Sequence, residues 1–192
     1  MRRLVVLPLV AVLLGGGVAA AAPTATAAPT TGTVCPTGWG SLPEDRTAAG
    51  SLPLVNVRTG AQPCFDRIVL DVPGSSAAHP VGYHVRYVDT LYQDGSGRPV
   101  PVRGGALIEI VVEAPSYDVG TGGATYPGRA GQPLPGVDLT GYRTFVEAKF
   151  ASSFEGRTQL GLGVRARLPF QVFQLDGRLV VDVAHSWTAT AR

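Results

Sequence analysis

The sequence has few cysteines, few histidines and no surplus of charge. Its 192 residues include two cysteines, three histidines and one methionine. Basic residues number 16 and acidic residues 14, and two of the basic ones, Arg2 and Arg3, stand at the start of the chain. Without these two arginines the chain is formally neutral, so it lacks the basic surface by which proteins hold nucleic acid or anionic lipid.

Long hydrophobic runs are also missing beyond the N-terminus. Residues 4–14 are apolar, and three glycines follow at 15–17. Crossing a bilayer takes about 20 apolar residues, so this run is too short, and its charged, apolar and small-residue order is typical of a secretory signal peptide. We expect residues 1–28 to be a signal and the protein to be secreted, with no membrane insertion after cleavage. An uncleaved anchor is the alternative, while lipidation of Cys35 is excluded by the preceding Val34 and by its distance from the run.

The composition then suggests one exported domain. Residues 23–33 are mostly proline, threonine, alanine and glycine, which bury too little apolar surface to order themselves. We expect residues 29–50 to be a tether and N-terminal segment, and residues 51–192 to form a single domain of ordinary size.

The two cysteines, Cys35 and Cys64, favour a disulfide because the chain is addressed to an oxidising compartment. A zinc site is the rival interpretation, but the three histidines, His79, His84 and His185, are scattered without ligand spacing. We therefore expect a disulfide, no metal and no cofactor.

Alternation of apolar and polar residues is the dominant pattern, and it predicts strands over 83–88, 106–113, 142–150 and 160–168. The third of these has one exception, because Phe145 falls on its polar side. Gly104-Gly105 and Asp176-Gly177 resemble two-residue hairpin turns. Many short strands with turns between them indicate an all-β fold, a two-sheet β-sandwich of about eight or nine strands.

One stretch interrupts this rhythm. Residues 115–141 contain six glycines within 120–136 and several prolines. Long loops inside compact domains are usually functional or disordered, and we expect a mobile surface loop in preference to a binding lid.

Two distant segments share a pattern, Arg-Ile-Val-Leu-Asp-Val at 67–72 and Arg-Leu-Val-Val-Asp-Val at 178–183. As strands, each would direct its arginine and aspartate to one face, giving the pairs Arg67 with Asp71 and Arg178 with Asp182. This pseudo-twofold internal repeat makes the four residues candidate ligand-binding positions. An ordinary solvated strand face is the alternative, because such pairs are common there and contribute little.

The wider pattern resembles the AMIN-like family of exported bacterial proteins, relatives of the AMIN domain of cell-wall amidases and secretins. The resemblance rests on Cys-Pro at 35–36, Trp-Gly-Ser-Leu-Pro at 39–43, Cys-Phe-Asp-Arg-Ile-Val-Leu-Asp at 64–71, residues 83–87, Phe-Glu-Gly at 154–156, Leu-Pro-Phe-Gln-Val-Phe at 168–173, and the closing 178–183. It implies two related sheets, each exposing a similar motif outward, and a role in targeting the cell wall. This chain carries neither the catalytic domain of the amidases nor the pore-forming part of the secretins.

Catalytic patterns are weak. Gly95-Ser96-Gly97 is better explained as a turn than as a nucleophile elbow, and Asp182, His185 and Ser186 lie too close in sequence for a triad to be expected. Four glutamates could supply a glycosidase pair, namely Glu109, Glu113, Glu147 and Glu155. Glu109 and Glu113 alternate with aliphatic residues and are predicted to be solvated. We expect no enzyme.

Aromatic and arginine side chains offer a second set of binding candidates. Trp39 and Trp187 could stack on sugars, although covering the disulfide is the simpler role for Trp39. Arg165 and Arg167 could bind carboxylate or phosphate beside Gly161 and Gly163, where a ligand could approach the backbone; a solvated strand face is the alternative.

The sequence therefore predicts a non-catalytic exported binding module of the cell envelope whose partner is cell-wall polymer, with peptidoglycan as the expected polymer. A domain that binds another envelope protein is the alternative, and a glycan-cleaving enzyme is a weaker one.

Overall fold

The computed structural model describes residues 35–36, 38–48 and 52–187. The expected signal peptide, 1–28, lies outside the described residues. Within them the secondary structure consists of nine strands: β1 (Glu44–Arg46), β2 (Asn56–Ala61), β3 (Phe65–Asp71), β4 (Tyr83–Val88), β5 (Ala106–Val112), β6 (Phe145–Phe154), β7 (Arg157–Val164), β8 (Phe170–Leu175) and β9 (Arg178–Ala184). The described residues contain no helix long and apolar enough to cross a membrane.

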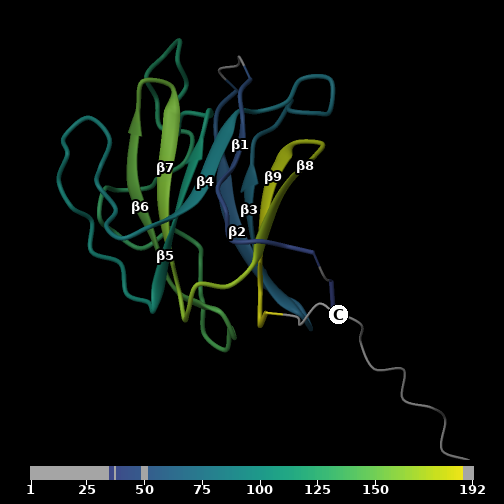
Figure 1. The fold of residues 1–192 in the computed structure, drawn as a ribbon. Helices are drawn as coiled ribbons and strands as arrows, with labels where there is room; N and C mark the ends of the chain where they lie inside the picture. Colours follow the sequence, from purple (N-terminus) through teal and green to yellow (C-terminus); the bar gives the residue numbers. More distant parts are fainter. Residues whose placement is uncertain (1–34, 37, 49–51, 188–192) are drawn as a thin grey trace, which may run out of the picture. The chain divides into compact units, whose positions relative to one another are not determined.

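The strands form two antiparallel sheets, ordered β1-β4-β5-β7-β6 and β2-β3-β9-β8 (Figure 1). One hydrophobic cluster takes side chains from both sheets, with Ile68 and Leu179 from the four-stranded sheet and Ile108 and Leu160 from the five-stranded sheet, all four fully buried. Shared burial of this kind holds two sheets face to face. The predicted two-sheet sandwich is confirmed.

Alternation located β4 and β5 well, whereas the predicted ranges 142–150 and 160–168 are each shifted by several residues from β6 and β7, and the faces differ at the start of β6. Val146 was predicted to face inward and Phe145 outward, yet Phe145 is 3% exposed and Val146 39% exposed. The pairing of β6 with β7 shifts register between Phe145 and Glu147. Because such a bulge adds one residue to a strand, it reverses the faces on its two sides.

The turns are partly as expected. Asp176 and Gly177 join β8 to β9 as a two-residue hairpin, and Glu155 and Gly156, with φ of 47° and 79°, join β6 to β7 in the same way. Gly104-Gly105, in contrast, does not close a hairpin. A Cβ on Gly105 would lie 2.1 Å from the carbonyl oxygen of Arg165, so glycine allows two backbones to pass closely.

Residues 115–141 contain no named strand and are mostly exposed, as expected of a surface loop, but the loop is anchored in the core at two points, and its mobility stays a prediction. Tyr126 and Leu134 are each 3% exposed and belong to the main core. The segment also pairs with the outer edge of β6, through a bridge from Pro133 to Lys149 and a 3.1 Å hydrogen bond from the Leu134 amide to the Ala148 carbonyl. Buried side chains and edge pairing make it part of the sandwich.

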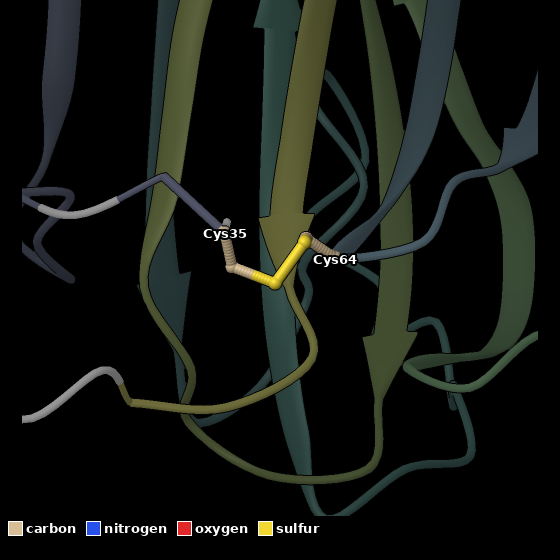
Figure 2. Close-up of a disulfide and its surroundings, with 2 residues drawn as sticks. All are labelled: Cys35 and Cys64. Carbon is tan, nitrogen blue, oxygen red and sulfur yellow. A yellow bond between two sulfur atoms is a disulfide. The ribbon is translucent and has the colours of Figure 1, made fainter. Parts of the chain in front are cut away.

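The other side of the sandwich is closed by residues 38–48, which we call the strap. Cys35 is bonded to Cys64 just before β3, which confirms the predicted disulfide and anchors the start of this region (Figure 2). The strap then bridges β8, where the Phe170 amide donates to Gly40, and continues as β1, which pairs with β4. It therefore links the four-stranded sheet to the five-stranded sheet.

The outer face of the five-stranded sheet is covered by the chain itself. Leu91 and Val100, from the segment 89–103, form a small buried cluster with Ala151. A Cβ on Gly161 would lie 2.4 Å from Leu91, and one on Gly163 would lie 1.8 Å from the Arg103 carbonyl oxygen. The space beside these two glycines is therefore occupied by the segment 89–103. The expectation that a ligand could approach the backbone there is wrong.

Candidate binding face

The two repeated segments lie side by side in one sheet. β3 and β9 pair antiparallel, so that Val69 faces Val180, Arg67 faces Asp182 and Asp71 faces Arg178. The two copies are thus related by a local twofold axis near the valine pair. The expectation of one motif on each sheet is wrong, and each arginine meets the aspartate of the other copy.

These residues lie on the outward side of the four-stranded sheet, which we call the motif face. It comprises Asn56, Arg58, Phe65, Arg67, Val69, Asp71, Gln171, Phe173, Leu175, Arg178, Val180 and Asp182. Strand alternation places them together because their neighbours in sequence, such as Ile68 and Val181, fill the core.

One end of the motif face is an ion pair between a buried aspartate and a half-buried arginine. Arg67 donates from Nε and Nη2 to the two oxygens of Asp182, at 2.6 and 2.8 Å, and Gln171 donates to the same carboxylate at 3.2 Å. The Arg67 guanidinium lies 5.2 Å from the centre of the Phe65 ring and 5.3 Å from that of Phe173. Asp182 is fully buried, and its hydrogen bonds raise the pKa of Arg67.

The other end is open to solvent. Asp71 accepts two hydrogen bonds of 2.9 Å from Arg58 and one of 3.1 Å from Asn56, whereas Arg178 lies 3.9 Å away. Burial alone would raise the pKa of Asp71, but these donors and positive charges outweigh it and hold the pKa below its usual value. Arg58 and Arg178 keep side-chain exposures of 47% and 51%, which leaves them free to contact a large ligand.

Arg165 and Arg167 do not belong to this face. The predicted strand 160–168 ends at Val164, and both arginines lie on the connection from β7 to β8. Arg165 donates to the His185 carbonyl, and Arg167 donates to Ser41 of the strap at 2.9 Å. The structure therefore brings four of the six candidate residues together and places the other two elsewhere.

Two of the four candidate glutamates, Glu109 and Glu147, form ion pairs within the fold. Glu109 is 7% exposed, which corrects its predicted solvation, and it accepts from Arg86 at 2.8 Å and Gln159 at 2.7 Å. Burial would raise the pKa of Glu147, but the Arg103 amide and side chain and the Lys149 charge outweigh burial and lower it. A glycosidase acid needs a raised pKa, so Glu147 is poorly suited to that role.

Sequence reasoning missed two groups. Arg58 and Asn56 complete the motif face from β2, a strand without a clear repeat. Asp66 is fully buried, accepts from the amides of Thr144 and Phe145 at 2.5 and 3.1 Å, and lies 3.0 Å from Nε2 of His185. A carboxylate at an inward strand position was the available signal for Asp66.

Comparison with known proteins gives one match. The family model described as the AMIN-like domain matches residues 52–185, a range that contains both motif strands. No curated protein matches the chain, and no solved structure does.

Proposed function

The chain belongs to the AMIN-like domain family, and on this premise we propose that it is a non-catalytic module that binds cell-wall polymer through the motif face. Family membership indicates an envelope-associated module, and the disulfide fits an oxidising compartment outside the cytoplasm. The finer assignment, to peptidoglycan as partner, is our proposal. We also propose that residues 1–28 direct export and that residues 51–192 form the binding domain.

The observation that carries the proposal is the pairing of both motif copies on one face. The Arg67–Asp182 pair holds β3 and β9 rigidly together, and the opposite end presents Arg58 and Arg178 to solvent. Leu175, 45% exposed, adds an apolar contact at the same end. Peptidoglycan carries carboxylates and sugar rings, which suit exposed guanidinium groups and apolar side chains on a flat surface.

Sedimentation with purified cell wall tests the proposal. We expect the exported protein to pellet with the wall and the double variant Arg58→Gln/Arg178→Gln to pellet much less, with binding that weakens as salt rises. Arg143→Gln is the matched control, because it removes an exposed cation away from the motif face. A wild-type protein that stays in the supernatant would contradict the proposal.

Arg67 is a poorer test residue than its exposure suggests. Removing it would leave the fully buried Asp182 without its partner and so disturb folding. Loss of binding in Arg67→Ala would therefore be harder to separate from loss of folding than loss of binding in the exposed pair, and thermal melting serves as the control for both variants.

A second candidate function is binding of an envelope protein at β2, which is an outer strand of its sheet. In the described residues, the other long edges are bridged, β8 by Gly40 and β6 by Pro133. An open edge can accept a strand from a partner. The Gln62 amide donates to the Phe65 carbonyl of β3, and successive amides along a strand point alternately toward and away from the partner strand. The Thr59 amide, three residues earlier, therefore points away from β3, toward the side of β2 that has no partner strand. Capture of an envelope protein that Thr59→Pro abolishes would favour this function.

A further inference from the structure

Arg167 has a fixed guanidinium with donors to spare. Its Nε donates to Ser41 Oγ at 3.2 Å and its Nη2 to the Ser41 carbonyl at 2.9 Å. One face of the group lies 4.8 Å from the centre of the Tyr87 ring. These contacts use one edge of the guanidinium, so the edge formed by Nη1 and the second Nη2 hydrogen is left to donate.

The positive charge of Arg167 is not neutralised by an ion pair in the described part of the chain. Among the described residues, neither Arg167 nor Arg165 has a carboxylate within ion-pair distance, and both are exposed. Arginines on the motif face, by comparison, meet Asp71 or Asp182. Two unpaired arginines on one short connection attract an anion.

An exposed aromatic ring is held beside them. Trp187 is 57% exposed, and its indole N–H donates to the Arg167 carbonyl at 3.0 Å. The fold thereby satisfies the polar atom of the indole and fixes the ring, while its surface remains in solvent. The electron-rich face of such a ring suits the C–H groups of a sugar.

A hollow of about 690 Å³ adjoins the Arg167 side chain, and Trp187 lies next to it through its hydrogen bond to the Arg167 carbonyl. Arg167 and Tyr87 line the hollow together with Gly104, Gly105 and Asp89. It lies where β4 ends and β5 begins. The two glycines pack closely against the backbone of Val164 and Arg165, and Asp89 supplies an acceptor for hydroxyl groups.

We propose that Arg167, Trp187 and this hollow form a second binding site, which takes an acidic sugar unit of a glycan. The ring contacts the sugar face, and the free guanidinium edge binds its carboxylate in a bidentate fashion. The site lies apart from the motif face, on the connection between the sheets. It rests on the proposed function in that a wall polymer would supply the glycan, but its chemistry can be measured alone.

Calorimetric titration of the exported protein with a tetramer of galacturonic acid tests the site, with the methyl-esterified tetramer as matched neutral ligand. We expect the acid to bind roughly tenfold more tightly than the ester, and Trp187→Ala and Arg167→Lys each to weaken acid binding roughly tenfold or more. Arg167→Lys keeps the charge but loses the bidentate edge. Arg143→Gln should bind as the wild type does.

Failure of the site and failure of the wall-binding function give different results. A protein that sediments with cell wall but does not bind the acidic tetramer overturns the second site and leaves the function standing. Tetramer binding that survives both variants, or that does not distinguish acid from ester, also overturns it. Tetramer binding without sedimentation keeps the site and contradicts the function. Thermal melting of each variant verifies that it is folded.

Discussion

Arg67 and Asp182 are joined by two short hydrogen bonds although 115 residues separate them in the chain. The contact ties the first strand of the repeat to the second. Its twofold counterpart, between Asp71 and Arg178, is looser at 3.9 Å and exposed. The same residue types thus have different environments at the two ends of one strand pair.

The two ends should differ in their contribution to stability. Asp182→Ala leaves Arg67 without a partner between two rings, and we expect a loss of about 2–4 kcal/mol in the free energy of unfolding, below the full cost of a buried pair because Arg67 keeps 31% exposure. Asp71→Ala, the same change at the open end, should cost less than about 1 kcal/mol. Denaturant unfolding measures both, and equal losses would contradict the assignment of a buried and an open end.

Acid should destabilise the protein partly through Glu147. The pKa of its carboxyl in the folded protein is below the usual 4.5, so its stabilising effect is complete above about pH 4.5 and is lost as the pH falls through the lowered value. In the Glu147→Gln variant, the free energy of unfolding should therefore decrease less between pH 5 and pH 3 than it does in the wild type. The pKa of Asp71 is also lowered in the folded protein, and Asp71 is still present in the variant, so some loss of stability in acid should persist. An unchanged slope would contradict the role given to Glu147.

Breaking the disulfide should loosen the strap. Replacing Cys35 and Cys64 by alanine opens a link between residues 29 apart in sequence, which in the chain-entropy model costs about 3–4 kcal/mol. Because the strap covers β8, the amides of Phe170 and Val172 should then exchange faster with solvent; they donate to Gly40 and to Glu44. Hydrogen exchange measures this, and unchanged protection of these amides would show that the strap holds without the disulfide.

A glycine pair tests the covering of the five-stranded sheet. Gly163→Ala places a Cβ against the Arg103 backbone, and we expect a loss of about 1–3 kcal/mol or more as the segment 89–103 is displaced. Gly60→Ala is the control, because its Cβ would make only an ordinary 3.6 Å contact with the end of the Gln62 side chain. That change should stay within about 0.5 kcal/mol. Thermal unfolding compares the two variants.

Strand positions and their faces could be predicted where local alternation is regular. The range 83–88 corresponds to β4, and Ile108, Ile110 and Val112 of β5 are fully buried. Alternation failed at Val146, because a bulge depends on how two strands pair and not on one strand alone. The disulfide was predictable from cysteine count and compartment.

Burial on the outer sheet face could not be predicted. Glu109 has the pattern of a solvated residue, yet the segment 89–103 covers it and Gln159 links it to the Tyr92 carbonyl. In the same way, the glycines and prolines of 115–141 indicate a loop, while Tyr126 and Leu134 fill the core. A local pattern reports the preferences of a segment but not what packs over it.

The sequence by itself determined that Arg67, Asp71, Arg178 and Asp182 lie outward on two strands, because side chains alternate along any strand. It could not determine that these strands are neighbours, since a strand pattern carries no record of its partner. Only the tertiary structure decided that Val69 faces Val180, and that register makes Asp182, and not Asp71, the partner of Arg67. The physical reason is that strand pairing is set by the packing of both sheets around one core, which is a property of the whole chain.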